Sequence, residues 1–230
     1  MALQAVDGAR SVNLDALTAR GRDTRQRLAS AASNGDRARG LRPAGSLMSR
    51  LRRERLHSPP RRPDTWPGEH YKLLTALVAL LAPKTIIEIG TATGMSALTM
   101  KSALGEDGKI VTFDVVPWHR YPGAVLQEDD FNDGRLEQRL DDLSTSAGWQ
   151  ANAELLRQAE FILVDAIHDG VQERGFLRGF DQIGLARGPI VMFDDIRLWG
   201  MLAFWQEIAR PKLDLTSFGH WSGTGLVDYA

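Results

Sequence analysis

Four short apolar runs, each ending in or beside a carboxylate, constrain the fold of this 230-residue chain more than any other feature. They are residues 85–90 (TIIEIG), 109–114 (KIVTFD), 161–165 (FILVD) and 190–195 (IVMFDD). Short continuous apolar runs are typical of buried strands in a parallel sheet. Ligands of such sheets bind at the carboxyl ends of the strands, so we expect a binding site edged by acids. The acids concerned are Glu88, Asp114, Asp165, Asp194 and Asp195.

From Trp66 onward, strand-like runs alternate with amphipathic segments, which predicts an α/β fold. Five strands are expected near residues 85–89, 109–114, 135–140, 161–165 and 190–194, and helices at 68–82, 94–104, 149–159, 171–183 and 196–209. Two further strands, 213–218 and 225–229, follow each other without a helix and predict an antiparallel hairpin. The expected domain is therefore a Rossmann-like, mostly parallel sheet of seven strands, with helices on both faces.

Residues 1–65 differ in composition from the rest of the chain, with 14 Arg, no Lys and 6 acids, against 14 basic and 23 acidic residues in 66–230. Leucines at roughly helical spacing predict a helical N-terminal extension that ends at the linker-like residues 58–63 (SPPRRP). We interpret this extension first as a lid or dimer arm. A solvated tail and a nucleic-acid-binding patch are the alternatives, although no aromatic interleaving supports the last one.

Several classes of protein are disfavoured by composition. The chain has no cysteine, so a disulfide framework and a thiolate site are excluded, and a reducing cytoplasm fits best. No apolar run approaches the roughly 18 residues of a membrane-spanning helix, and no secretory signal is present. A transit peptide is a weaker interpretation of the N-terminus, because the arginine bias continues too far.

A spaced-glycine loop, residues 88–96 (EIGTATGMS), follows the first predicted strand and begins a helix. Gly90 permits a sharp turn and Gly94 a close backbone approach. Ala92 and Met95 stand where a dinucleotide fingerprint requires glycine, and no P-loop lysine follows. Asp114 ends the next strand, where an acid commonly binds ribose hydroxyls, although a turn cap is the plainer interpretation.

The "EIGxxxGxS" form of this loop resembles that of the class I S-adenosylmethionine-dependent methyltransferases, and within them the catechol and caffeoyl-coenzyme A O-methyltransferase branch. The resemblance covers roughly residues 66–230, including the terminal hairpin. It implies S-adenosylmethionine as cofactor, with Asp114 at its ribose and Asp142 near its adenine. The residues implied at the methionine end are Glu88, Gly90, Thr91, Gly94 and Ser96.

Three further carboxylates are expected to converge, because Asp165 ends one strand and Asp194 and Asp195 end the neighbouring one. Such groups repel one another unless a cation or protons intervene, and oxygen ligands suit Mg²⁺, Mn²⁺ or Ca²⁺. We therefore predict a divalent-metal site formed by these three residues. The plainer interpretation is that Asp195 caps the helix expected at 196.

His168, three residues after Asp165, is the predicted catalytic base, acting together with Asp165. The pattern resembles that of metal-dependent O-methyltransferases, whose base at this spacing is lysine in catechol-type and histidine in macrolide sugar-type enzymes. Ile167 departs from the sugar-type motif, which often carries an acid there. Without the resemblance, a histidine after a strand is most often an ordinary loop residue.

The predicted reaction is methyl transfer from S-adenosylmethionine to a hydroxyl of a small molecule, whether a natural product, a sugar or a phenol. Candidate acceptor-binding residues are Trp199, Met201, His220 and Trp221, whereas Trp205 is expected in the core and His70 and Tyr71 are placed to close the site. We expect a homodimer or higher homo-oligomer, no nucleic-acid partner and no membrane. A non-methylating enzyme on the same fold and an RNA-binding methyltransferase are the rival hypotheses.

Overall fold

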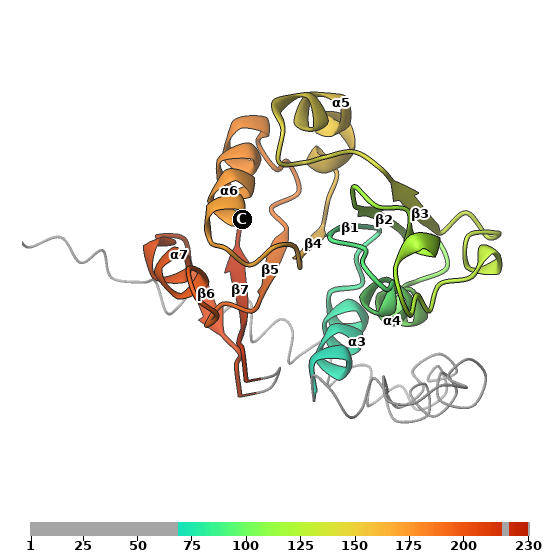
Figure 1. Cartoon of the computed structure of the whole chain (residues 1–230), viewed down its shortest axis with the longest axis horizontal. Coiled ribbons are helices and arrows are strands. Elements are labelled where there is room, and N and C mark those ends of the chain that lie inside the picture. Colours follow the sequence, from blue (N-terminus) through green and yellow to red (C-terminus); the bar gives the residue numbers. More distant parts are fainter. Residues whose placement is uncertain (1–68, 218–220, 230) are drawn as a thin grey trace, which may run out of the picture. The chain divides into compact units, whose positions relative to one another are not determined.

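The computed structural model of the chain describes residues 69–217 and 221–229, and its centre is one seven-stranded sheet in the order β3-β2-β1-β4-β5-β7-β6 (Figure 1). The five strands β1 to β5 are parallel, as predicted. Strand bounds are β1 Thr85–Ile89, β2 Lys109–Phe113, β3 Leu136–Arg139, β4 Phe161–Val164, β5 Ile190–Asp194, β6 Lys212–Asp214 and β7 Thr224–Asp228. The chain order reverses between β1 and β4, which is where this class of sheet opens a ligand crevice.

Helices cover both faces of this sheet, which explains why its strands read as continuous apolar runs. They are α3 His70–Leu81, α4 Met95–Ala103, α5 Ser146–Arg157, α6 Val171–Ile183 and α7 Met201–Glu207, with short 3₁₀ turns at Trp118–Arg120 and Glu128–Asp130. In β1, Ile86 packs in the core cluster that includes α3 and α4. Ile87 and Ile89 pack in the opposite cluster, with α5, α6 and α7. Because alternate side chains of a strand point to opposite faces, both must be apolar here.

The terminal hairpin is present, and β7 pairs antiparallel with both β6 and β5. The β6 strand is the sheet's edge, with all three residues exposed, and is shorter than the expected 213–218. A short strand with Lys212 and Asp214 is a common way to protect an open sheet edge from pairing with other chains.

The predicted helix at 196–209 is wrong at its start, because α7 begins only at Met201. Asp195 and Trp199 have φ values of 56° and 32°, which no right-handed helix allows. The intervening loop is bonded to the segment before β7, since the N–H groups of Ile196 and Arg197 donate to the carbonyls of residues 223 and 222. Asp195 therefore caps no helix and lies in a loop at the carboxyl edge of the sheet.

The expected N-terminal extension, residues 1–65, lies outside the described residues, so its role and its boundary with 66–230 stay predictions. Within the described part of the chain, every helix is too short or too polar to cross a membrane.

Candidate active site

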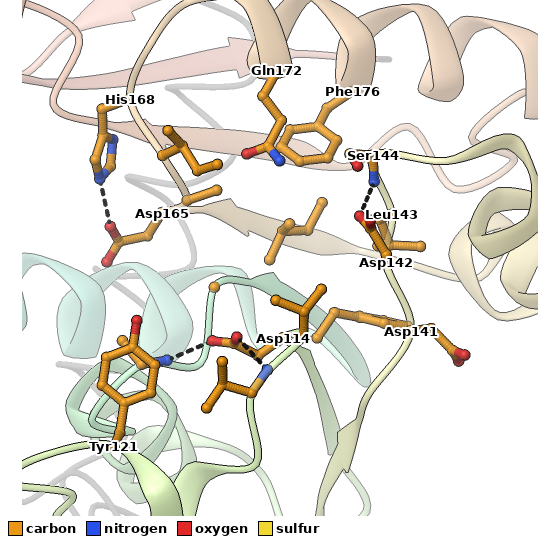
Figure 2. A pocket seen from close by; sticks show the side chains of 18 residues that line it. Asp114, Tyr121, Asp141, Asp142, Leu143, Ser144, Asp165, His168, Gln172 and Phe176 are labelled. Carbon is orange, nitrogen blue, oxygen red and sulfur yellow. Dashed lines mark hydrogen bonds and ion pairs between the residues drawn. The ribbon is translucent and has the colours of Figure 1, made fainter.

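A cavity of about 400 Å³ opens at the carboxyl ends of β1, β2 and β4 (Figure 2). Five of the predicted site residues line it, namely Gly90, Asp114, Asp142, Asp165 and His168. Figure 2 shows His168 and Asp165 at one end of the cavity, and Asp142, Ser144 and Phe176 at the other. The cavity therefore lies at the sheet edge predicted from the four apolar runs, and residues from distant parts of the chain line it.

The glycine loop owes its shape to protein contacts on both sides. Gly90 has a φ of 105°, and a Cβ atom there would lie 1.8 Å from the carbonyl oxygen of Asp165. Gly94 has a φ of 79° and lies against the Leu126 side chain, which a Cβ would approach to 2.2 Å. Glycine at position 90 therefore lets the loop after β1 pass directly over the end of β4.

Asp114 holds this loop in place. Its Oδ2 accepts hydrogen bonds from the backbone N–H groups of Thr91 and Ala92, both at 3.0 Å, and its Oδ1 accepts one from Val116 at 2.9 Å. A carboxylate has about four acceptor positions, so room remains for a further donor from the cavity. The predicted ribose-binding residue is thus at the cavity wall and already organises the neighbouring loop.

Glu88, Thr91 and Ser96 are buried residues of the glycine loop itself and do not line the cavity. Glu88 is completely buried, and its burial raises the pKa of the carboxyl to about 8, partly offset by the nearby hydroxyls of Ser96 and Thr112. The hydroxyls of Thr91 and Thr112 are 2.7 Å apart. These buried residues stabilise the conformation of the loop, and their predicted contact with a cofactor stays a prediction.

Asp142 follows β3 at the far end of the cavity. Its Oδ1 accepts a hydrogen bond from the N–H of Ser144 at 2.8 Å, and Leu143 and Phe176 provide apolar walls beside it. A carboxylate next to apolar walls suits a flat ring with polar edges, such as a purine. This arrangement agrees with the expected adenine end, without testing it.

The structure brings Asp165 and Asp195 together around His168. The Nε2 atom of His168 is 3.2 Å from Oδ1 of Asp165 and 3.6 Å from Oδ2 of Asp195. Because both carboxylates contact one nitrogen, their oxygens are well under a nanometre apart. The ends of β4 and β5 therefore do place acidic side chains at a common point, as the sequence predicted.

Asp194 does not join this group. Its Oδ1 lies 3.5 Å from Nδ1 of His70 on α3, and both residues are buried. Asp194 is the last residue of β5, whereas Asp195 follows it in the loop with a φ of 56°, and the two carboxylates meet different partners, His70 and His168. Among the described residues, no three His, Asp or Glu side chains gather closely enough to form a ready-made metal site. His70 does reach the strand ends from the preceding helix, as expected, but it meets Asp194.

The charge of His168 follows from these contacts. Burial lowers the pKa of the imidazole, but the hydrogen bond and charge of Asp165, together with the charges of Asp195 and Asp194, outweigh it and raise the pKa to about 9. His168 is therefore an imidazolium at neutral pH in this arrangement. An imidazolium offsets one of the two negative charges of these carboxylates, and it cannot accept a proton until these contacts are relieved.

Sequence reasoning missed Glu173, a completely buried residue in the first turn of α6. Its Oε1 accepts from the N–H of His168 at 3.0 Å, and its Oε2 from the N–H of Gly170 at 2.8 Å. A glutamate three residues into a helix that begins at a strand end is the available signal, because this position often bonds back to the preceding chain.

Non-glycine residues with positive φ gather around the same point. His168 has a φ of 62°, Asp195 of 56° and Ala92 of 43°. Such conformations cost about 1–3 kcal/mol each and persist where the surroundings hold them, most often at functional sites. The backbone and the charges thus identify the same three loops.

Comparison with known proteins decides the family. The sequence model of the O-methyltransferase family matches residues 43–201, which is more than half of the chain. The chain belongs to the O-methyltransferase family.

Individual relatives match the chain at 29–31% identity over part of its length. It is 31% identical to tricin synthase 2 of Oryza sativa subsp. japonica over 144 residues, 58% of this chain and 45% of that protein. It is 29% identical to caffeoyl-CoA O-methyltransferase 1 of Zea mays over 161 residues, 62% of this chain and 59% of that protein. The chain spans about half the length of these curated relatives. An O-methyltransferase from Bacillus cereus, solved in complex with SAH, shares the fold at a TM-score of 0.52 and 19% identity, covering 88% of this chain and 97% of that one.

The residues predicted to bind the acceptor are dispersed in the structure. Trp199 and Trp221 are 84% and 64% exposed, on loops joined by the bond from the Arg197 N–H to the carbonyl of Ser222. Met201 is completely buried in the core, so it would act only by supporting the residues above it. His220 lies outside the described residues. Trp205 is a core residue, as expected.

Proposed function

We propose that the protein transfers the methyl group of S-adenosylmethionine to a hydroxyl oxygen of a small molecule. The observation that carries this proposal is the common cavity: the glycine loop, Asp114 and the His168–Asp165 pair border one space of about 400 Å³. A methyl donor and a proton-handling group must be adjacent for this reaction, since alignment of the methyl and the attacking oxygen supplies much of the rate.

The cofactor would lie along the cavity with its methionine end near Gly90 and Asp165, its ribose near Asp114 and its adenine near Asp142. Family membership supports the choice of S-adenosylmethionine, as does the SAH in the similar Bacillus cereus structure. Four other residues of the glycine loop would act by fixing its backbone, namely Glu88, Thr91, Gly94 and Ser96.

His168 would take the proton from the acceptor hydroxyl. A phenol titrates near pH 10 and a sugar hydroxyl higher still, so deprotonation is the difficult part of the reaction. The pKa of about 9 favours proton uptake by His168 but also leaves it already protonated at neutral pH. The base must therefore lose its proton first, which requires the negative charge of Asp165 and Asp195 to be compensated in another way.

A divalent cation, Mg²⁺ or alternatively Mn²⁺ or Ca²⁺, is the compensation we propose, held by Asp165 and Asp195 with Asp194 as the third ligand. The donor set fits hard cations, and the two converging carboxylates already share one positive charge, that of His168. Asp194 takes part only if it gives up its contact with His70. When bound, such an ion lowers the pKa of a coordinated hydroxyl and fixes its oxygen.

The acceptor would be a phenol or a related hydroxylated natural product, as the names of the tricin synthase and caffeoyl-CoA relatives suggest. Trp199 and Trp221 would contact its apolar part, and the role of His220 in acceptor binding stays a proposal from the sequence. We also propose, as predicted from the sequence, a homo-oligomer in the cytoplasm with residues 1–65 as its lid or dimer arm.

The proposal is tested by isothermal titration with S-adenosylhomocysteine (SAH), with Mg²⁺ and with EDTA, followed by mass spectrometry of catechol acceptors. We expect SAH to bind in both conditions and the product to gain one CH₂ only with the metal. Asp165→Ala and His168→Ala should lower turnover at least a hundredfold, to a small residual rate, and leave SAH binding, whereas Asp107→Asn, which breaks an exposed pair with Lys84, should change neither. Normal turnover by the Asp165 variant in EDTA would refute the metal mechanism.

A further inference from the structure

We propose that Glu173 is a positioning residue for His168, and that it sets the place of the base through the backbone of the loop after β4. This inference rests on the proposed role of His168 as the proton acceptor. It concerns a side chain that does not line the cavity and would touch neither cofactor nor acceptor.

Both carboxylate oxygens of Glu173 are committed to this loop. One accepts the N–H of His168 at 3.0 Å and the other accepts the N–H of Gly170 at 2.8 Å, and the residue is completely buried. Hydrogen bonds with a charged acceptor in a buried setting are stronger than neutral ones. The two bonds span residues 168–170 and therefore fix this segment as one unit.

One of the two bonds of Glu173 caps the helix, since Gly170 is the N-cap residue of α6 and Glu173 its third helical residue, as in a capping box. The N–H groups of Val171 and Gln172, at the start of α6, are accepted by Oδ1 of Asp169 at 2.8 and 2.9 Å. The other bond of Glu173, to the N–H of His168, lies two residues before this cap and serves the loop alone. The burial of Glu173 is thus used to hold the loop, and that loop carries His168.

The loop needs holding because its backbone is strained. His168 has a φ of 62°, a left-handed conformation that L-residues rarely adopt because Cβ approaches the following carbonyl oxygen. Gly170, at a φ of 75°, is in turn confined by the neighbouring loop, since a Cβ there would lie 2.5 Å from the carbonyl oxygen of Gly200. Glu173 and the Gly200 segment therefore restrict the loop from two sides.

The bond at the His168 backbone determines where the imidazole points. With the backbone fixed in this conformation, the imidazole points at Asp165, as Figure 2 shows. Its Nε2 is 3.2 Å from Asp165 and 3.6 Å from Asp195. Relaxation of His168 to an ordinary φ would rotate the side chain away from both carboxylates. Glu173 thus acts on the reaction only through the placement of His168.

Glu173→Gln is the decisive variant, because glutamine has the same shape but offers one acceptor atom where two N–H groups need one each. Asp181→Asn is the matched control. Asp181 lies on the same helix as Glu173 and pairs with Arg210 at 2.8 Å in an exposed contact near the other end of that helix. Two measurements are made on each protein: the NMR resonance of the His168 Nε2–H, and the initial rate of methylation of 3,4-dihydroxybenzoate.

We expect the His168 resonance to shift in Glu173→Gln and to stay unchanged in Asp181→Asn. We also expect kcat to fall at least tenfold in Glu173→Gln, with KM for S-adenosylmethionine and the Kd of SAH within twofold of the wild type. In a His168→Ala background, the same glutamine substitution should lower the residual rate no further, since residues that act as one unit are not additive.

An unmoved His168 resonance in folded Glu173→Gln overturns the proposal, and so does an equal loss of rate in the His168→Ala background, which indicates a general effect on folding. If Glu173→Gln does not fold, Glu173→Asp enters the same cycle. Wild-type turnover by His168→Ala would instead refute the proposed base, whatever Glu173 does. The resonance decides the positioning role even where the probe acceptor is not turned over.

Discussion

Replacing Asp165 by asparagine should lower the pKa of His168 by removing the closer of its two carboxylate partners, the one at 3.2 Å. The rise of the pKa from 6.5 to about 9 corresponds to about 3 kcal/mol at about 1.4 kcal/mol per pKa unit. Solvent reaches 17% of the His168 side chain, and screening reduces the measurable part to about 1–2 kcal/mol. In Asp165→Asn we therefore expect a pKa about one unit lower, since Asp195 remains at 3.6 Å.

The sign of the effect on stability follows from linkage. The folded protein binds the His168 proton more tightly than the unfolded chain, so the stabilisation is complete below about pH 6.5 and is lost as the pH rises through about 9. The advantage of the wild type over Asp165→Asn should therefore shrink by about 1–2 kcal/mol between about pH 6 and about pH 9.5.

NMR titration of the His168 ring in EDTA-treated protein, with urea unfolding at both pH values, measures the two quantities. Asp107→Asn, an exposed carboxylate paired with Lys84, is the control and should leave the titration of His168 unchanged. A wild-type His168 that titrates near pH 6.5, or the same titration in Asp165→Asn, would refute the reasoning from the carboxylate contacts.

Three other substitutions test the cofactor loop. Glu88→Gln should gain stability relative to the wild type as the pH rises from about 5 to about 9. The pKa of the buried carboxyl is raised to about 8, so the wild type is destabilised between pH 4.5 and 8, whereas glutamine does not titrate. Thermal unfolding at both pH values checks this, and a wild-type pH dependence in the variant would contradict it. Gly90→Ala should destabilise the fold by about 3 kcal/mol or more, since its Cβ would lie 1.8 Å from the Asp165 carbonyl oxygen. Chemical unfolding measures this, and a loss of stability below about 1 kcal/mol would argue against the contact. Asp114→Asn should weaken SAH binding about tenfold or more, because the backbone N–H groups of Thr91 and Ala92 lose a charged acceptor. Calorimetry measures the Kd, and an unchanged value would remove Asp114 from the proposed site.

The sheet and the glycine loop could be predicted because their signals are local. A strand buried on both faces must be apolar throughout, and residues 85–89 and 161–164 show this directly. Gly90 was recognisable because a turn after a strand restricts the choice of residue. The convergence of Asp165 and Asp195 followed from parallel pairing alone, since neighbouring strand ends share one edge of the sheet.

What was missed depends on backbone angles and on contacts between distant segments. The apolar residues at 196–209 suit a helix, but the positive φ at Asp195 and Trp199 and the bonds to residues 222 and 223 delay its start to Met201. The contact of Asp194 with His70 of α3 and the positive φ of Asp195 are set by the folded chain, and the sequence pattern shows neither. Glu173 looks like any polar residue of a helix until its burial is known.

The reversal of strand order between β1 and β4 divides the sheet into two blocks, β3-β2-β1 and β4-β5-β7-β6, that join along one seam. The cavity straddles that seam, with Gly90 and Asp114 on one side and Asp165 and His168 on the other. A molecule bound there would contact both blocks. Its binding would raise the free energy of unfolding, by about 2.7 kcal/mol when the ligand is at a hundred times its Kd.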